Sequence, residues 1–222
     1  MKLSVVIPAL EEADWIAGAV ESSRTEDAVV IVVDGGSRDG TPDIAALAGA
    51  RVVASSPGRA RQLQVGAELS ESDVLVFLHA DTRLAPGYGA VIREGLRSPD
   101  VVGGAFRLRF DTRSASLRLV EWAARLRAAL FGWPYGDQVL FVRRAVLEEI
   151  GGVPQAPILE DLDLVRAMRR CGRLALLPLP VTTSARRYLE RGVWRTAGTH
   201  VLAAAGWTLG VDRARLARWL RR

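Results

Sequence analysis

The sequence predicts one α/β domain with a mostly parallel central sheet and helices on both faces of that sheet. Its 222 residues suit a single large domain, 1–222, and its 49% hydrophobic and 25% charged residues suit a packed core under a polar surface. Short apolar runs rich in β-branched residues recur along the first third of the chain and alternate with helical patterns. No repeat, linker or low-complexity segment divides the chain.

Three buried strands alternate with three helices in this first third. The strands are expected at residues 3–7, 28–33 and 74–78, and the helices at residues 13–22, 41–49 and 60–69. Continuous apolar runs of this length are typical of strands that helices cover on both sides. Thr41 as N-cap and Pro42 at the first helical position would open the second helix. Right-handed crossovers then bring the carboxyl ends of the parallel strands to one crevice, where such sheets bind ligands.

The pattern changes after Gly103. Strands are expected at residues 105–110, 138–142, 174–177 and 181–183, and helices at residues 114–131 and 161–171. The first of these strands alternates apolar and charged residues, which indicates a half-exposed position. Gly172 ends the second of these helices.

Arginine makes up almost all of the basic residues. Lys2 is the only lysine among 30 Lys and Arg, and the formal net charge is +5. A surplus of arginine fits phosphorylated or anionic partners, but its dispersion along the chain favours a general replacement of lysine, as in a genome of high GC content. Nucleic acid is not an expected partner, because no stacking or helix-in-groove motif accompanies the charge. The lone Cys171 excludes an intramolecular disulfide and a cysteine-based zinc site.

The two ends of the sequence indicate where in the cell the protein is expected. Residues 1–10 lack the apolar stretch of a signal peptide, so we expect a cytoplasmic protein. The tail, 193–222, is expected to be helical, and Arg195 and His200 interrupt it too early for the roughly 20 apolar residues that span a bilayer. Two alternatives remain for the tail: an amphipathic helix on the inner face of an anionic membrane, or a terminal helix packed on the domain.

Acidic residues follow three of the expected strands. Glu11 and Glu12 come after the first strand, Asp34 follows the second and Asp81 follows the third. Because these strand ends converge, a site is expected there, with a cation or a hydrogen-bonding ligand between the like charges. For any one of these residues alone, a helix cap or a turn is the simpler interpretation.

Two common phosphate-binding motifs are missing at this edge. The chain has neither G-x-G-x-x-G after the first strand nor G-x-x-x-x-G-K-[ST]. Phosphate is expected instead at Arg59 and Arg61, or on a divalent cation held by Asp81, since such ions prefer oxygen ligands.

Five segments carry a resemblance to a known family. They are SVVIPALEE at 4–12, VVDGGSRDGT at 32–41, ARQ at 60–62, FLHAD at 77–81 and LED at 159–161. In this order they resemble the family-2 glycosyltransferases with the GT-A fold, and in particular a small single-domain bacterial subgroup. The resemblance implies transfer of a sugar from a nucleotide-diphosphate donor, a UDP- or GDP-sugar, to an acceptor hydroxyl. It also implies Mn²⁺ or Mg²⁺ on the donor diphosphate.

The resemblance assigns roles on the nucleotide-binding half, 1–82. The residues that it places around the nucleotide are Pro8, Ala9, Glu11, Asp34, Arg61, His79, Ala80 and Asp81. Asp34 would face the base, Arg61 would lie beside the base or phosphates, and Asp81 matches the metal-binding last aspartate of D-x-D. His79 replaces the first aspartate of that motif, which leaves the metal fewer carboxylates. Gly35 replaces the second aspartate of another pair, so base specificity does not carry over.

The acceptor-binding half, 83–192, would supply the base. A carboxylate at a helix N-terminus can take the proton of the acceptor hydroxyl, so Asp161 is the expected general base of an inverting displacement, with Glu160 orienting the acceptor. The alternative is that both residues only cap their helix. Arg186 or Arg187 would contact the leaving diphosphate.

The acceptor itself is not indicated by the sequence. Two rival functions stay open: a nucleotidyltransferase on a related fold, and a non-catalytic nucleotide-sugar-binding protein.

Overall fold

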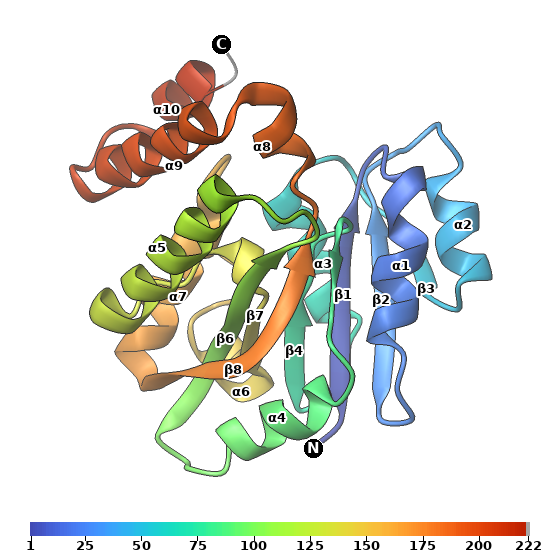
Figure 1. Cartoon of the computed structure of the whole chain (residues 1–222). Helices are drawn as coiled ribbons and strands as arrows, with labels where there is room; N and C mark the ends of the chain where they lie inside the picture. The colour runs from blue at the N-terminus through green and yellow to red at the C-terminus, as the bar shows by residue number, and fades with distance from the viewer. Residues whose placement is uncertain (221–222) are drawn as a thin grey trace.

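One eight-stranded mixed sheet runs through residues 1–220, the part of the chain that this computed structural model describes (Figure 1). Its strands are β1 (Leu3–Ala9), β2 (Ala28–Asp34), β3 (Arg51–Ala54), β4 (Val74–Phe77), β5 (Thr82–Arg83), β6 (Val101–Phe110), β7 (Leu140–Arg143) and β8 (Arg173–Thr183). They lie in the order β3-β2-β1-β4-β7-β6-β8-β5. Four of the seven neighbouring pairs are parallel, and β7 runs antiparallel to both of its neighbours.

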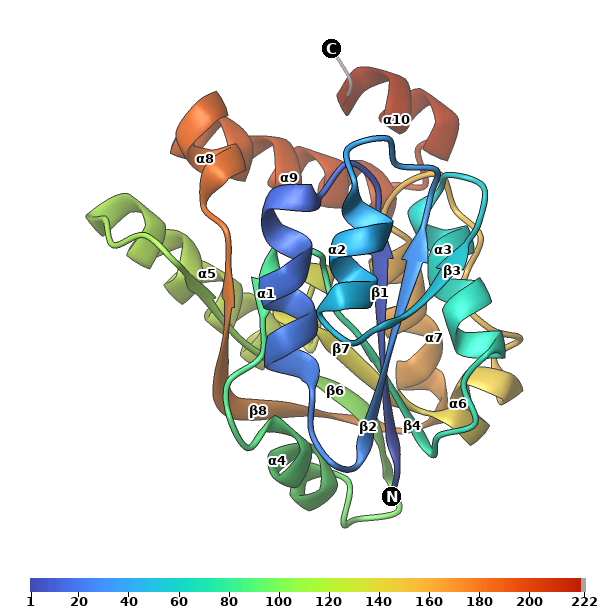
Figure 2. The same ribbon diagram turned by 90° about the vertical axis from the view of Figure 1, so that its right-hand side faces the viewer.

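Helices cover both faces of the sheet. They are α1 (Ala13–Ser23), α2 (Thr41–Leu47), α3 (Arg59–Glu68), α4 (Tyr88–Gly95), α5 (Ala115–Phe131), α6 (Arg144–Glu149), α7 (Glu160–Cys171), α8 (Arg186–Arg191), α9 (Val193–Thr208) and α10 (Arg213–Leu220). One apolar core joins the sheet to α1, α2 and α4, and a second joins its other face to α3, α6 and α7. Figure 2 shows α1 and α2 on one side of β1 and β2 and α3 on the other. The expected fold class is confirmed.

Burial follows the apolar patterns of the sequence. Every residue of the run Val74–Phe77 is buried, as expected for a strand in the middle of the sheet. Short elements with weaker patterns are absent from the expectation, namely β3, β5, α4, α6 and α8. The expected strands at 174–177 and 181–183 were wrong in one respect, because β8 is continuous. Pro178 and Pro180 break its pattern, and the chain accommodates them at a register shift opposite Ala105 and Arg107.

The start of α2 differs from the expectation. Gly40, with a φ of 86°, is the N-cap, and Thr41 is the first helical residue. The hydroxyl of Thr41 instead donates to Asp39 and accepts from the N–H of Glu12 at 2.9 Å. Thr41 therefore holds the beginning of α1 rather than its own helix.

The tail packs on the domain through α9. The indole N–H of Trp207 donates to Asp163 of α7 at 2.8 Å, and Arg213 of α10 is ion-paired with the same carboxylate at 2.6 Å. Trp133 meets Trp207 edge to face, with ring centroids 5.1 Å apart. Within residues 1–220 no helix has both the length and the apolarity that a bilayer span needs. Arg221 and Arg222, at the end of the expected tail, lie outside the described residues.

Candidate functional site

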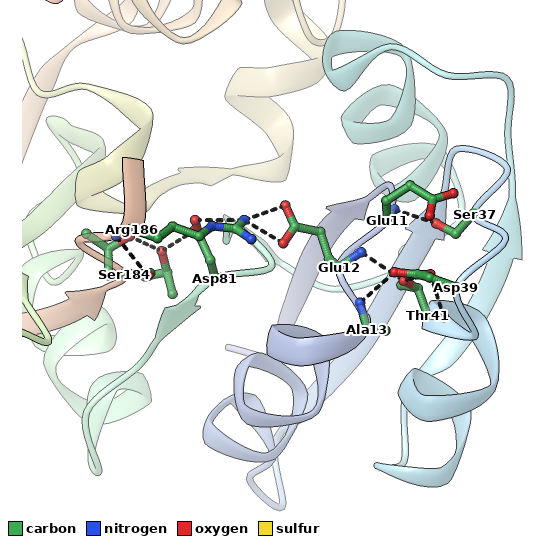
Figure 3. A network of polar contacts seen from close by, with 11 residues as sticks. Glu11, Glu12, Ala13, Ser37, Asp39, Thr41, Asp81, Ser184 and Arg186 are labelled. Carbon is green, nitrogen blue, oxygen red and sulfur yellow. Dashed lines mark hydrogen bonds and ion pairs between the residues drawn. The ribbon is translucent and has the colours of Figure 1, made fainter. Parts of the chain in front are cut away.

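The loops that follow β1 and β2 are hydrogen-bonded to each other (Figure 3). Glu11 N–H donates to Ser37 Oγ at 2.9 Å, and Glu12 N–H donates to Thr41 Oγ1 at 2.9 Å. Glu11 Oε1 in turn accepts from the N–H of Arg38 at 2.8 Å. The carboxylate of Glu11 is thereby used within the loops, whereas that of Glu12 turns toward the end of β4 (Figure 3).

The buried side chains of Asp34 and Gln62 stabilise the carboxyl ends of β1 and β2. The buried carboxylate of Asp34 accepts from the N–H groups of Gly36 and Ser37 at 2.9 and 3.0 Å, which shapes the tight turn after β2. The buried amide of Gln62 donates to carbonyls near the ends of β1 and β2, both at 2.8 Å. α3 is thus attached to both strand ends, and the crevice edge is held rigidly.

Arg186 provides the positive charge that was expected between the convergent carboxylates. Its Nη2 lies 2.6 Å from Glu12 Oε2 and 3.3 Å from Asp81 Oδ2 (Figure 3). Burial raises the pKa of Glu12 above its ordinary value, although the hydrogen bond from Arg186 acts in the opposite sense. The arginine therefore joins the ends of β1 and β4 across residues that are 174 and 105 positions away in sequence.

Two acidic residues begin α7 opposite these strand ends. Asp161 Oδ2 accepts from the N–H of Gly136 at 2.7 Å, and its Oδ1 accepts from the N–H of Leu162 at 2.9 Å. A Cβ on Gly136 would lie only 3.1 Å from Asp161 Oδ2 and 3.2 Å from His79 Nε2, so this close approach favours glycine. Leu159, just before the helix, has a φ of 59°, which is a strained conformation for leucine.

Arg59 at the start of α3 connects α7 to the end of β4. Its Nε is ion-paired with Glu160 Oε1 at 3.0 Å, and its Nη2 contacts His79 Nε2. Burial raises the pKa of Glu160 despite Arg59. Burial, together with Arg59 and Arg187, holds the pKa of His79 well below its usual value, so the imidazole is neutral at pH 7.

Two cavities meet at this point. We call the first one the strand-end cavity. Its volume is ≈ 1190 Å³ and that of the second cavity is ≈ 950 Å³, and both volumes include space open to solvent. The strand-end cavity has its own lining from the loops after β1 and before α3, which includes Pro8, Ala9, Leu10, Glu12, Pro57 and Gly58. We call the second one the tyrosine cavity, and its own lining includes Tyr135, Asp137, Glu160, Asp161, Tyr188 and His200. Four residues line both: Arg59, His79, Asp81 and Arg187.

Asp137 is the least satisfied acid of the tyrosine cavity. Its Oδ1 is buried and has no hydrogen-bond partner within the described residues. Burial raises the pKa of Asp137 above its ordinary value, although Arg127 and His200 act in the opposite sense. A buried carboxylate oxygen without a donor is costly, which marks it as a group that a ligand could satisfy.

A scan of protein-family models matches residues 4–149 to glycosyl transferase family 2. The match covers more than half of the chain. The chain belongs to glycosyl transferase family 2. The matched region contains β1 to β4 and the strand-end loops, and it ends before α7, where Glu160 and Asp161 lie.

Known relatives of this family-2 chain include glucosyl-3-phosphoglycerate synthases. The enzyme of Mycolicibacterium paratuberculosis is 38% identical over an alignment of 92 residues, and the match covers 36% of this chain and 28% of that protein. The solved structure of the Mycobacterium tuberculosis enzyme with Mn²⁺, uridine diphosphate and glucosyl-3-phosphoglycerate has a TM-score of 0.68 at 24% identity, covering 95% of this chain and 81% of that one. A mycobacterial protein of solved structure has a TM-score of 0.58 at 26% identity, covering 82% of this chain and 65% of that one. These superpositions confirm the GT-A-type fold.

The structure distributes the expected site residues of this family-2 chain over three places. Pro8, Ala9 and Ala80 line the strand-end cavity, Glu160 and Asp161 line the tyrosine cavity, and His79, Asp81 and Arg187 line both. Glu11, Asp34 and Arg61 line neither of these cavities, and Arg61 is exposed on α3. Their roles toward a nucleotide stay predictions.

Several lining residues carried no usable signal in the sequence. Tyr135 and His200 lie in segments without a motif. Tyr135 lines the tyrosine cavity from the loop after α5, and His200 lines it from α9, which packs against β6 and α5. Glu11 and Glu12 are adjacent acids at the same strand end, so the sequence does not show which of them faces the site. In the structure the carboxylate of Glu11 accepts from the N–H of Arg38, whereas that of Glu12 accepts from Arg186.

Replacing Asp137 with asparagine is expected to stabilise the family-2 chain by about 1 kcal/mol at pH 7, because it removes a buried, unsatisfied charge. Since the folded-state pKa is raised, the folded protein binds the proton more tightly than the unfolded chain does. The stability of the unsubstituted protein should therefore rise toward that of the variant as pH falls from 7 toward 4. Thermal unfolding of both proteins across this range measures the difference.

Glu71→Gln, at an exposed acid between α3 and β4, serves as the control and should change neither the stability nor its pH dependence. An Asp137→Asn variant that is less stable than the unsubstituted protein at pH 7 would show that the Asp137 carboxylate is satisfied after all.

Proposed function

We propose that this chain transfers a sugar from a UDP-sugar to an acceptor hydroxyl, with UDP-glucose as the first donor to test. One observation carries the proposal: the strand-end cavity and the tyrosine cavity share Arg59, His79, Asp81 and Arg187. A nucleotide in the first cavity would present its sugar to an acceptor in the second. The solved relative from Mycobacterium tuberculosis binds UDP-glucose, Mn²⁺ and phosphoglyceric acid, which supports this donor class.

The leaving diphosphate would meet positive charge at the junction of the cavities. Arg59 and Arg187 both line it, and guanidinium groups pair well with phosphate oxygens. Charge that develops on the leaving group is stabilised best by groups already in place, and the ion pair with Glu160 holds Arg59 at this junction. The nucleoside would lie against Pro8 and Ala9, at the end of β1.

A divalent cation fits this site through Asp81. Within residues 1–220 no cluster of three or more His, Cys, Asp or Glu could hold an ion unaided. Mg²⁺ is nevertheless commonly held by one or two carboxylates together with substrate phosphates, and Asp81 lines both cavities. Asp81 would thus hold Mn²⁺ or Mg²⁺ in exchange for its contact with Arg186. The ion, when bound, supplies positive charge to the diphosphate.

Asp161 would act as the general base of an inverting displacement. Each of its carboxylate oxygens accepts one backbone N–H, which orients the group toward the tyrosine cavity that it lines. Each oxygen keeps a second lone pair that can accept the proton of the acceptor hydroxyl. The proton would pass to Asp161 as the acceptor oxygen attacks the anomeric carbon and the bond to the diphosphate breaks.

The charges of the tyrosine cavity restrict the acceptor. Four carboxyl groups line it against two guanidinium groups, and Arg59 is already paired with Glu160. A phosphoglycerate-like acceptor would add further negative charge to an acid-rich cavity. We therefore propose an acceptor that carries no phosphate or carboxylate next to the reacting hydroxyl.

Release of UDP from UDP-glucose tests the function. With Mn²⁺ present we expect slow release without an acceptor and faster release with an uncharged hydroxyl acceptor, and we expect EDTA to stop both. 3-Phosphoglycerate should accelerate release less than the uncharged acceptors do. If no UDP- or GDP-sugar is hydrolysed or shifts the melting temperature, the proposed activity is wrong; if only 3-phosphoglycerate accelerates release, only the acceptor proposal is wrong.

A further inference from the structure

Helix α9 has two faces of different character. Thr196, Ala203 and Trp207 are buried on its inner face, and His200 lines the tyrosine cavity. The outer face exposes its large apolar side chains instead. They are Trp194 at 63%, Val201 at 67%, Leu202 at 57% and, just after the helix, Leu209 at 82% relative exposure.

Three of these exposed side chains, Trp194, Val201 and Leu209, lie on one continuous stripe. Positions 194, 198, 201, 205 and 209 recur every three or four residues, so they share one side of a helix. Gly198 and Ala205 fill the positions between Trp194, Val201 and Leu209, and no polar residue interrupts the series. An exposed apolar stripe of this length on a surface helix marks a site of contact with another protein or with a membrane.

The neighbouring helices also expose large apolar side chains. α9 packs against both α8 and α10 (Figure 1), and these helices expose Leu189 and Trp219, at 56% and 48%. We define the outer α9 surface as these two residues together with Trp194, Val201, Leu202 and Leu209.

Exposed arginines accompany the outer α9 surface. They are Arg191, Arg195, Arg215 and Arg218. Arg186 and Arg213, in contrast, are ion-paired with acids of the domain. From residue 186 to 220 the sequence holds only two acids, Glu190 and Asp212. The net charge that faces outward from this part of the chain is therefore positive.

We propose that the outer α9 surface adsorbs to an anionic lipid bilayer, with α9 lying in the plane of the membrane. Tryptophan and aliphatic side chains on one face, with arginine around them, are the features of helices that lie at the interface between lipid and water. Arginine can extend its charge to the headgroups while its stem stays on apolar surface. Anionic lipid also attracts each basic residue near the membrane surface.

The charge distribution favours lipid over a second copy of the chain. A two-fold contact through this surface would bring the same patch of both copies together, and with it their arginines. Like charges at such a contact are unfavourable, whereas anionic headgroups complement them. The opposite face of α9 contributes His200 and Ala203 to the tyrosine cavity, so adsorption would hold that cavity close to the membrane surface.

Sedimentation of the full chain with lipid vesicles tests the proposal. Vesicles of 30% phosphatidylglycerol in phosphatidylcholine should bind the protein at least about tenfold more tightly than vesicles of pure phosphatidylcholine. Adding 0.5 M NaCl should reduce this preference, because salt shortens the distance over which charges attract from its value of about 10 Å at 0.1 M. The Val201→Ser/Leu202→Ser variant should lose about tenfold in binding to the anionic vesicles, because it removes apolar area from the adsorbed face.

Leu47→Ser is the matched control, since Leu47 is 87% exposed on α2, on the other side of the molecule (Figure 1). It should bind vesicles as the unsubstituted protein does. Arg195→Glu/Arg218→Glu should weaken binding to anionic vesicles more than to neutral ones, and circular dichroism checks that each variant is folded. Equal binding to both vesicle types, or a folded Val201→Ser/Leu202→Ser variant that binds normally, would overturn the proposal. So would a dimer, detected by light scattering, that this variant dissociates.

Discussion

Replacing Asp161 with asparagine is expected to lower kcat for sugar transfer by about 10²–10⁴-fold, the usual contribution of a positioned general base. Asparagine has nearly the same shape, and its carbonyl oxygen can still accept the N–H of Gly136 that Asp161 Oδ2 accepts at 2.7 Å. Its amide nitrogen cannot accept the N–H of Leu162, as Oδ1 does at 2.9 Å, but that contact lies within the first turn of α7. The substitution therefore removes the proton acceptor and leaves the junction between α7 and the Gly136 loop in place. Steady-state kinetics with UDP-glucose and an active acceptor measure the change, and KM for the donor should stay within about twofold because the base does not hold the donor.

Asp163→Asn is the control for this experiment. Asp163 lies in the same first turn of α7, but its carboxylate binds Trp207 and Arg213 instead of lining the tyrosine cavity. This variant should lose stability and keep its turnover at a temperature where it is folded. Unimpaired turnover by Asp161→Asn would show that another group takes the proton, and Asp137 would be the next candidate, since it lines the same cavity.

Replacing Asp81 with asparagine is expected to abolish the effect of Mn²⁺ on UDP binding. For the unsubstituted protein, UDP and Mn²⁺ at about 100 times their joint Kd should add about 2.7 kcal/mol of stability. In a chain of this length that corresponds to roughly 5–10 °C in Tm. The variant should show no difference between UDP with Mn²⁺ and UDP with EDTA, because the carboxylate that would hold the ion is gone. Differential scanning fluorimetry of each variant against itself measures the shift.

The Glu12→Gln variant distinguishes the loss of a metal ligand from the loss of an ion pair with Arg186. Glu12 and Asp81 both contact Arg186, at 2.6 and 3.3 Å, so either substitution disturbs the same ion-pair network. Only the loss of Asp81 should remove the response to Mn²⁺. If Glu12→Gln removes the response to Mn²⁺ and Asp81→Asn keeps it, the ion is held at the end of β1 and not at the end of β4.

The proposed site contains buried carboxyl groups, whose charged form is costly to hold in a folded protein. Glu12, Asp137 and Glu160 all have a pKa raised by burial, and each lines one of the two cavities. Raised values of this kind collect at functional sites, because charge that a folded chain would otherwise avoid is placed there for a ligand. The gain in stability expected from Asp137→Asn is one consequence of that placement.

Local pattern was sufficient for much of the fold. Apolar runs such as 28–33 and 74–78 predict the inner strands, because a strand covered on both faces needs apolar residues without alternation. Acids after these runs then predict where a site lies, since parallel strands end at one edge of the sheet. The order of five short segments adds the family, which the match over residues 4–149 confirms.

The sequence by itself thus determined the fold class, the family and the edge of the sheet that bears the site, because each depends on patterns within a few residues. Only the tertiary structure decided which side chains face that site. Glu11 and Glu12 are adjacent in sequence, yet the loop after β2 engages the first, while Arg186, 174 residues away, pairs with the second. Such choices depend on where distant segments pack, and no local pattern encodes the distance between α8 and β1.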